Sequence, residues 1–261
     1  MKLSIITINY NNLEGLKRTY DSVVSQTCYD FEWIIIDGGS TDGSKEFIEE
    51  RQEHFAYWCS EPDKGIYNAM NKGIAKATGE YLQFLNSGDN LVDDRVIEEF
   101  LALGWDEDVI SGDIVIDGDR SRVSKNPEEE DLDFDKLRLG TLTHPPSFIK
   151  KLLFKQYGSY DESLMIVSDW KFFLEVLIIH NHSYRHWNRL VTVFYTDGMC
   201  SKIENQKLHI MERASVLAQY SRIIRSIDKR DKRIQELDLP VMTIFKRNAW
   251  AKIKKWLEAK L

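Results

Sequence analysis

The stretch "GIYNAMNKGIAKATGEYLQFLNSGD", Gly65 to Asp89, joins a helix pattern to a strand pattern that ends abruptly in polar residues. Apolar residues recur at helical spacing in its first half, and Gly79 is placed to stop that helix. "EYLQFLN" then reads as a buried strand, which must end at "NSGD" because Gly and Asp are poor strand residues. Taken alone, such an end is typical of a turn. The rest of the chain decides whether this strand end is only a turn or part of a binding site.

Three more strand patterns precede this stretch, and helix patterns separate them. The strands are expected at Leu3–Asn9, Phe31–Asp37 and His54–Ser60, with helices after the first two. Strands that are apolar throughout and alternate with helices indicate a parallel sheet that is covered on both faces. The first part of the chain is therefore predicted to be α/β.

The second part of the chain is less regular. A hairpin is expected around Asp117–Asp119, and the acidic run Glu128–Asp135 is interpreted either as a solvated loop or as a mobile lid. Pro145 and Pro146 exclude a helix before Ser147. Further patterns predict a helix over 168–181, a strand over 186–196, and helix from Lys202 to the end apart from Pro240.

Composition restricts the class of protein. The length of 261 residues suits one large α/β domain or one and a half ordinary ones, and 43% of hydrophobic residues is enough for a core. The formal charge of −7 argues against broad nucleic-acid binding. Three well-separated cysteines form no CxxC pair and are typical of reduced thiols in a cytoplasmic protein. Neither a signal peptide nor a membrane-spanning run is recognisable. We expect a cytoplasmic protein, attached at most to the inner face of the membrane.

Polar residues gather where the predicted strands end. Ligands of parallel α/β sheets bind outside the carboxyl ends of the strands. Those ends carry Thr7, Asn9, Tyr10, Asp37, Asp63, Asn86 and Asp89. Carboxylates at successive strand ends repel one another, and a bound cation or a ligand rich in hydrogen-bond donors would relieve that repulsion.

Neither a dinucleotide-binding G-x-G-x-x-G nor a Walker loop is present. A hard divalent cation, held by carboxylates and by the phosphates of the ligand, is the remaining common way to bind a diphosphate. Asp89 is then the predicted metal ligand, and Gly88 allows the diphosphate to approach the backbone closely.

At this point the sequence resembles a known family. The segments "SIITINYNN", "WIIIDGGSTDGS", "EPDKGIYNAMNKGIAKATGEYLQFLNSGD" and "YDESLMIVSDWKFFLE" together resemble the inverting family 2 glycosyltransferases with the GT-A fold. The resemblance covers Met1 to Asp197 and points to bacterial enzymes that build surface polysaccharides. It implies a nucleotide-sugar donor, foremost a UDP-sugar, and a Mg²⁺ or Mn²⁺ ion. It also implies a saccharide or lipid-linked saccharide acceptor and a direct displacement at the anomeric carbon.

The resemblance also assigns donor-binding residues. Asp37 would accept a hydrogen bond from the base, and Thr7, Asn9 and Tyr10 would line the base and ribose pocket. Asp63 and Asn71 would lie beside the nucleotide and sugar. These assignments are implied by the family's motifs, although this chain has Ile8-Asn9 where the family usually has Pro-Thr.

"NSGD" stands where the family carries its Asp-x-Asp signature, and here the chain departs from the pattern. Asn86 and Gly88 occupy acidic positions, so Asp89 is the remaining carboxylate ligand, and Asn86 is left to bind a sugar hydroxyl. With fewer charges the metal should bind more weakly and depend more on the diphosphate. His144, before the double proline, is a second candidate for metal or diphosphate contact; the alternative is a structural histidine.

Asp169 in "VSDWKFF" matches the family's catalytic base, which takes the proton of the acceptor hydroxyl. The alternative is that Ser168 and Asp169 only cap a helix, where an acidic residue is favoured anyway. Asp161 competes for the role of base but is expected to be a capping or supporting residue.

The C-terminal "FKRNAWAKIKKWLEAKL" predicts a basic amphipathic helix, which suits an anionic membrane surface. Packing on the catalytic domain, or on a second subunit of a homo-oligomer, is the alternative. We therefore divide the chain into a glycosyltransferase domain, 1–228, and a helical extension, 229–261.

Two other classes of function remain open from the sequence. One is a non-catalytic nucleotide-sugar-binding subunit of a polysaccharide assembly complex, which the reduced Asp-x-Asp signature permits. The other is a nucleotidyltransferase of similar fold, although such enzymes usually carry a glycine-rich basic loop after the first strand, where this chain has "TINYNNLEG".

Overall fold

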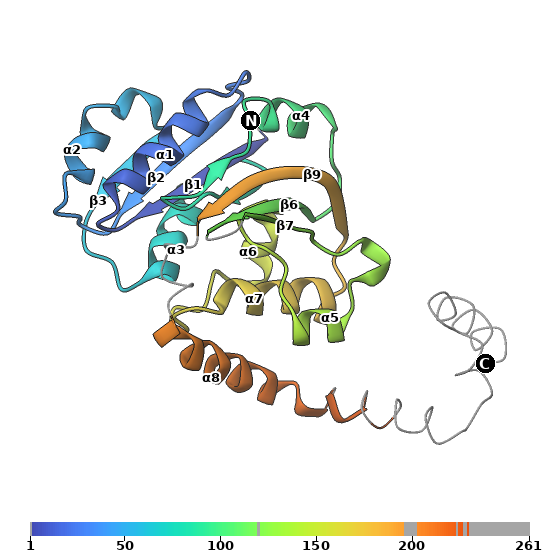
Figure 1. Cartoon of the computed structure of the whole chain (residues 1–261). Helices are drawn as coiled ribbons and strands as arrows, with labels where there is room; N and C mark the ends of the chain where they lie inside the picture. Colours follow the sequence, from blue (N-terminus) through green and yellow to red (C-terminus); the bar gives the residue numbers. More distant parts are fainter. Residues whose placement is uncertain (1, 119–120, 196–202, 223, 227–228, 230–261) are drawn as a thin grey trace. The chain divides into compact units, whose positions relative to one another are not determined.

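A single mixed sheet forms the centre of the computed structural model, which describes residues 2–118, 121–195, 203–222, 224–226 and 229 (Figure 1). Its strands are β1 (Leu3–Asn9), β2 (Phe31–Asp37), β3 (Tyr57–Ser60), β4 (Tyr81–Phe84), β5 (Asn90–Leu91), β6 (Val109–Asp117), β7 (Arg122–Ser124), β8 (Ser147–Lys150) and β9 (Tyr184–Tyr195). They lie in the order β3-β2-β1-β4-β8-β6-β9-β5, with β7 paired to β6.

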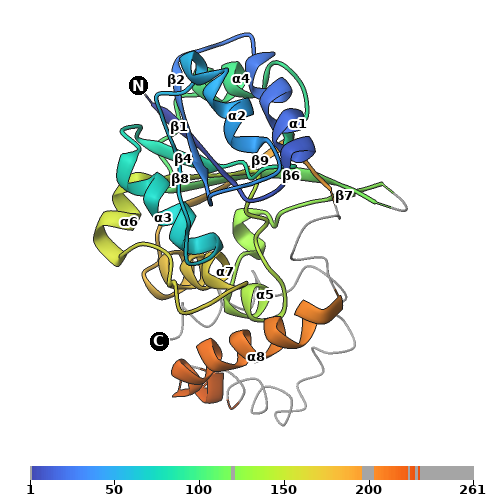
Figure 2. The same cartoon turned by 90° about the vertical axis from the view of Figure 1, so that its left-hand side faces the viewer.

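Helices cover both faces of this sheet. The helices of the described chain are α1 (Leu13–Val24), α2 (Ser44–Glu49), α3 (Ile66–Lys76), α4 (Val96–Ala102), α5 (Phe134–Leu139), α6 (Lys151–Tyr157), α7 (Ser168–Phe173) and α8 (Ile203–Gln219), and there are 3-10 turns at Gln52–His54 and Glu129–Asp131. In both views α1, α2 and α4 lie on one face of the sheet, and α3 and α6 lie on the other (Figures 1 and 2). The predicted α/β class is confirmed.

The N-terminal half follows the parallel pattern expected from the sequence. β3, β2, β1 and β4 are parallel neighbours, and the register of β1 on β2 places Asn9 opposite Asp37. Every residue of β1 is buried, as an apolar strand between two helical layers requires. The polar ends of β1 and β2 therefore lie side by side at one edge of the sheet.

The second half of the sheet is not parallel throughout. β8 is antiparallel to both β4 and β6, whereas β6 and β9 are parallel. The β6–β7 hairpin is confirmed, with its turn partly outside the described residues. No strand was expected at 147–150, but Phe148 and Ile149 are fully buried there because β8 lies inside the sheet.

Close packing of α3 on β1 brings the start of α3 to the sheet edge. Gly73 makes this possible, since a Cβ atom at that position would lie 2.4 Å from Cγ2 of Ile6. The apolar face of α3 then packs on the sheet, and its N-terminal residues Ile66 and Tyr67 lie beside the end of β4, where both residues line a cavity with Asn86.

The expected helix over 168–181 forms as α7 followed by a π-helical turn, Leu174–Ile179. The expected C-terminal helix is described as α8, whereas the basic segment 245–261 lies outside the described residues. The chain divides after Arg213 into two units, and the site described below belongs entirely to the first. Among the residues that the structure describes, no helix has both the length and the apolar character needed to cross a membrane.

Candidate active site

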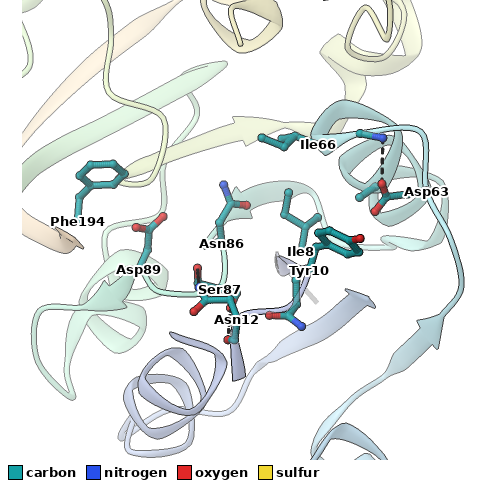
Figure 3. A pocket seen from close by; sticks show the side chains of 12 residues that line it. Ile8, Tyr10, Asn12, Asp63, Ile66, Asn86, Ser87, Asp89 and Phe194 are labelled. Atoms are coloured by element: carbon teal, nitrogen blue, oxygen red, sulfur yellow. Dashed lines mark hydrogen bonds between the residues drawn. The ribbon is translucent and has the colours of Figure 1, made fainter. Parts of the chain in front are cut away.

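A cavity of about 270 Å³ lies at the ends of β1 and β4, beside the start of α3; we call it the edge cavity (Figure 3). It is lined by Ile8, Asn9, Tyr10, Asn12, Asp63, Gly65, Ile66, Ala69, Asn86, Ser87, Asp89 and Phe194. Five of the site residues expected from the sequence are in this set. The structure thus brings together segments from β1, α3, the end of β4 and the end of β9.

Asp37 lies behind this cavity and does not line it. Its carboxylate is fully buried and accepts hydrogen bonds from the Asn9 amide at 2.7 Å and from the hydroxyls of Ser40 and Ser60, both at 2.6 Å. The backbone N–H groups of Gly39 and Ser40 also donate to it. Asp37 therefore holds Asn9 in place, and its direct contact with a base stays a prediction.

Thr7 lies away from the cavity as well. Its side chain is fully buried, and its hydroxyl accepts a hydrogen bond of 3.0 Å from the Trp33 indole. Trp33, its partner, belongs to the hydrophobic core cluster that also includes Leu16 and Val23 of α1. The structure therefore does not bring Thr7 to the other predicted donor-binding residues.

Two amide oxygens at the edge cavity are buried without a hydrogen-bond partner in the described part of the chain. They belong to Asn9 and Asn86, and both side chains line the cavity. A buried acceptor without a donor costs roughly 1–3 kcal/mol, so such atoms are usually satisfied by water, an ion or a ligand. Both residues line a cavity that can hold such a group.

The turn that carries Asp89 is fastened to α1. Thr19 accepts a hydrogen bond of 2.9 Å from the backbone N–H of Gly88, and its hydroxyl donates to the Asp89 carbonyl at 2.8 Å. Gly88 has a φ of 109°, which a residue with a side chain rarely adopts. Thr19 is a supporting residue that the sequence patterns did not reveal, since it lies on the buried face of a helix.

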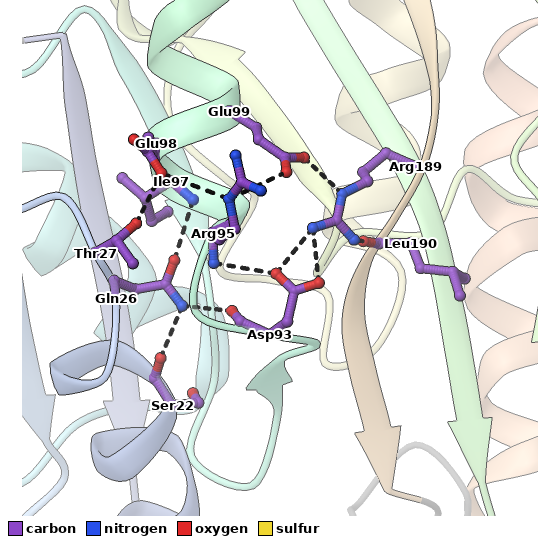
Figure 4. Close-up of polar contacts among 10 residues, drawn as sticks. All are labelled: Ser22, Gln26, Thr27, Asp93, Arg95, Ile97, Glu98, Glu99, Arg189 and Leu190. Atoms are coloured by element: carbon purple, nitrogen blue, oxygen red, sulfur yellow. Dashed lines mark hydrogen bonds and ion pairs between the residues drawn. The ribbon is translucent and has the colours of Figure 1, made fainter.

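A second set of polar contacts holds the chain just after β5 (Figure 4). Arg189 on β9 donates to both oxygens of Asp93, at 2.8 and 2.7 Å, and to Glu99 on α4 at 2.8 Å. Burial raises the pKa of Asp93, but hydrogen bonds from Arg189 and from the Arg95 backbone outweigh it, so the net pKa is lowered. Gln26, just after the end of α1, also donates to the Asp93 carbonyl. Asp89 thus lies between two anchored segments.

Asp169 lines a second cavity, of about 260 Å³, which we call the Asp169 cavity. Its lining residues are Ile66, Tyr67, Met70, Asn86, Asp89, Ile114, Ile116, Thr141, Leu142, Thr143, His144, Pro145, Met165, Ile166, Asp169 and Phe194. The Tyr67 hydroxyl donates a hydrogen bond of 2.7 Å to Asp169 Oδ1. Tyr67 is a second supporting residue that was missed, because only the fold brings it to Asp169.

The two cavities meet. Ile66, Asn86, Asp89 and Phe194 line both of them. Asp89 is only 6% exposed, so its carboxylate lies at a largely enclosed junction. Tyr10 and Asp63 line the edge cavity alone, whereas Asp169 lines the Asp169 cavity alone.

His144 is buried at the wall of the Asp169 cavity. Its Nε2 atom is 2.8 Å from the Tyr160 hydroxyl, and its ring stacks on Phe84 with centroids 4.9 Å apart. Burial lowers the pKa of His144, and the nearby charge of Asp169 offsets this only in part, so a neutral ring is favoured at pH 7. Across the described residues, no group of three or more His, Cys, Asp or Glu side chains is arranged to hold a metal ion.

Asn71 and Asp161 support the wall near Asp169 and line neither cavity. Asn71 donates to the Tyr160 carbonyl and to Glu162, both at 2.9 Å, and accepts from the Tyr160 N–H. Asp161 forms an ion pair of 2.8 Å with Lys171. Hydrogen bonds from Lys171 and Ser163 lower the pKa of Asp161 to about 2. A donor contact of Asn71 stays a prediction.

The acidic segment Glu128–Asp135 is attached to β9. His186 lies 3.0 Å from Glu128, and its backbone N–H donates to Glu129 at 3.0 Å. Arg185 pairs with Glu129 as well. Residues Glu129–Asp131 form a short 3-10 turn, and α5 begins at Phe134, so the segment is more structured than the expected solvated loop.

Comparison with known proteins identifies the family. Residues 4–158 match Glycosyl transferase family 2. An uncharacterized glycosyltransferase of Mycobacterium tuberculosis (strain H37Rv) is 34% identical over 184 residues, which are 68% of this chain and 69% of that protein. A PGL/p-HBAD biosynthesis glycosyltransferase of the same strain is 31% identical over 176 residues, 65% of this chain and 67% of that protein. The chain belongs to glycosyltransferase family 2.

Solved structures agree on the fold. TarS 1-349 of S. aureus in complex with UDP has a TM-score of 0.64 at 18% identity, covering 75% of this chain and 60% of that chain. The mannosyltransferase PcManGT of Pyrobaculum calidifontis in complex with GDP-Man and Mn²⁺ has a TM-score of 0.61 at 16% identity. The match covers 86% of this chain and 64% of that chain. This chain thus spans about three fifths of the TarS chain, and its fold is GT-A.

Proposed function

We propose that this glycosyltransferase moves a sugar from a nucleoside-diphosphate donor in the edge cavity to an acceptor hydroxyl in the Asp169 cavity. The observation that carries the proposal is that the two cavities meet at Asn86 and Asp89. Transfer needs such a junction, because the anomeric carbon must face the leaving diphosphate on one side and the acceptor on the other.

Donor recognition is assigned to the edge cavity. Tyr10 is 65% exposed beside Asn9, so its ring is available to cover a base or ribose, and the unpaired Asn9 oxygen can accept a hydrogen bond from either. Asp63 lines the same cavity at the start of α3. We propose a UDP-sugar as the donor, with support from the UDP complex of TarS; the GDP-Man complex of PcManGT makes GDP-sugars the competing choice.

A divalent metal fits the junction. The Asp89 carboxylate and the unpaired Asn86 amide oxygen are both hard oxygen ligands, and diphosphate oxygens would complete the shell of Mg²⁺ or Mn²⁺. When bound, such an ion would offset the negative charge that develops on the departing diphosphate. Its site would therefore have a single carboxylate. His144 is a poorer ligand, since Nε2 is engaged with Tyr160.

The proposed chemistry is one displacement with inversion. Asp169 accepts the proton of the acceptor hydroxyl, whose oxygen bonds to the anomeric carbon while the bond from that carbon to the diphosphate oxygen breaks. Tyr67 orients the Asp169 carboxylate through its hydrogen bond. The electron pair leaves with the nucleoside diphosphate, and the proton stays on Asp169 until solvent removes it.

We place the reaction in bacterial surface polysaccharide biosynthesis, with a saccharide or lipid-linked saccharide as acceptor. Membrane attachment through 245–261 belongs to the same proposal, since a lipid-linked acceptor lies at a membrane surface. A non-catalytic sugar-nucleotide-binding subunit is the competing function, favoured only by the loss of carboxylates at Asn86 and Gly88.

A two-part experiment tests this function. Thermal unfolding is measured with UDP, GDP and UDP-GlcNAc, each with and without Mn²⁺; a ligand at one hundred times its Kd adds about 2.7 kcal/mol to the free energy of unfolding. We expect stabilisation by a uridine nucleotide that Mn²⁺ increases. The product of the preferred donor is then examined by NMR, and retention of the donor's anomeric configuration would exclude the single displacement.

A further inference from the structure

We infer that the acceptor is a neutral molecule whose reactive hydroxyl lies beside an apolar aglycone, such as an alkyl or phenyl group, rather than a free sugar or a sugar phosphate. The inference rests on the proposed function and specifies the class of acceptor for the same site. It comes from the composition of the Asp169 cavity and from its charge.

Apolar atoms make up most of the surface that lines the Asp169 cavity, although Tyr67, Asn86, Asp89, Thr141, Thr143 and His144 line it as well as Asp169. β6 contributes Ile114 and Ile116, the segment before β8 contributes Leu142, and the segment before α7 contributes Met165 and Ile166. A free sugar presents hydroxyl groups on most of its faces, and burying those that meet the apolar part of the lining without partners costs free energy. An alkyl or phenyl group gains free energy from the same walls, at roughly 25 cal/mol per Å² of apolar surface buried.

The described lining of this cavity also lacks a positive charge. Its acidic side chains are those of Asp89 and Asp169, and burial lowers the pKa of its histidine, His144. Arg213 is close enough for Asp169 to affect its pKa, but its guanidinium donates to the carbonyls of Leu137, Arg138 and Gly140. A phosphate group beside Asp169 would face its carboxylate, and the cation proposed at Asp89 would be taken up by the donor diphosphate, so a phosphate next to the reactive sugar is disfavoured.

Met165 gives the apolar wall an opening to solvent. Its side chain is 60% exposed although it lines the cavity, and Glu212 fixes its backbone by accepting from the Met165 N–H at 2.7 Å. Ile166 is held by the same carboxylate. An aglycone that extends from the reactive sugar can therefore pass along Met165 and leave the cavity there.

The test compares acceptors that share one sugar and differ in the aglycone. Methyl, octyl and phenyl glycosides and the sugar 1-phosphate of several common hexoses are offered with UDP-GlcNAc, UDP-glucose and GDP-mannose. We expect kcat/KM for the octyl or phenyl glycoside to exceed that for the methyl glycoside at least tenfold, and the 1-phosphate to be the poorest. Donor hydrolysis without acceptor is followed separately.

Variants of residues that line the Asp169 cavity test whether this cavity causes the preference for an apolar aglycone. Met165→Gln and Ile116→Thr should each reduce the octyl-to-methyl ratio several-fold. Leu103→Gln serves as a matched control, because Leu103 is 55% exposed and lines neither cavity. Equal use of methyl and octyl glycosides, preference for the 1-phosphate, or donor hydrolysis without transfer to any glycoside would overturn the inference. Absence of donor binding and hydrolysis would instead contradict the proposed function.

Discussion

The hydroxyl of Tyr67, in the first turn of α3, donates a 2.7 Å hydrogen bond to Asp169 in the first turn of α7, across 102 residues of sequence. Tyr67 is 5% exposed, so its hydroxyl is held by packing. The same turn of α3 contributes Ile66 to both cavities. One helical turn therefore links the donor side of the site to its proposed base.

Replacing Tyr67 by Phe removes this hydrogen bond and retains the ring. We expect kcat/KM to fall about tenfold to a hundredfold, because a carboxylate that is not held in place transfers protons less efficiently. The KM for the donor should stay within about twofold, because Tyr67 lines the Asp169 cavity and not the edge cavity. Steady-state rates over a range of donor concentrations measure both effects.

The control for this variant is Tyr29→Phe, which removes a hydroxyl that donates to the Val24 carbonyl on the protein surface. It should change neither kcat nor the KM for the donor. A loss of donor affinity in Tyr67→Phe that accounts for the whole fall in kcat/KM would mean that Tyr67 supports only the packing of α3.

Asn86 offers a direct test of the reduced metal signature. Asn86→Asp places a second carboxylate at the junction, and we expect Mn²⁺ to bind about tenfold more tightly in the presence of UDP. Asn86→Ala removes the unpaired amide oxygen and should weaken Mn²⁺ binding. Titration calorimetry with Mn²⁺ in saturating UDP measures the change. Identical affinity in all three proteins would place the metal away from Asn86.

Asp161 gives a prediction for stability against pH. Its pKa, about 2 in the folded protein, lies below the ordinary value of about 3.9, so the ion pair with Lys171 stabilises the fold above pH 4. That contribution is lost as the pH falls toward 2. Asp161→Asn should therefore cost on the order of 1 kcal/mol at pH 7, since the carboxylate is one third exposed and partly screened.

Urea unfolding at pH 7, 5 and 3 follows this difference, which should shrink on acidification. Glu14→Gln is the matched control, because its pair with Lys17 is solvated and should contribute almost nothing. A difference between Asp161→Asn and the unchanged protein that stays constant from pH 7 to 3 would show that the charge of Asp161 is not responsible.

The sequence predicted the parallel half of the fold because its signals are local. Apolar runs such as Phe31–Asp37, bounded by Gly38 and Gly39, specify buried strands without reference to the rest of the chain. The short strand β8 gave no such signal, since its burial depends on a position between β4 and β6 that only the tertiary structure provides. A four-residue segment with two apolar residues, Phe148 and Ile149, cannot be assigned to strand or helix by periodicity alone.

The site was predictable at the level of strand ends but not of side-chain direction. Asn9, Tyr10 and Asp89 line the edge cavity as expected, whereas Thr7 and Asp37 are turned into buried hydrogen bonds with Trp33 and Ser60. The alternation of strand side chains would have placed Thr7 and Asn9 on one face of β1, so spacing alone did not separate them. Where a strand ends and the chain turns, the alternation no longer predicts the direction of a side chain.

The central claim is that Asp169 removes the acceptor proton across the junction from the leaving diphosphate. The most direct measurement is the rate of sugar transfer by Asp169→Asn beside the affinity of the same variant for UDP with Mn²⁺. We predict that transfer falls at least a thousandfold while UDP affinity stays within about twofold, since Asp169 lines only the acceptor side. Transfer at the rate of the unchanged enzyme would contradict the account.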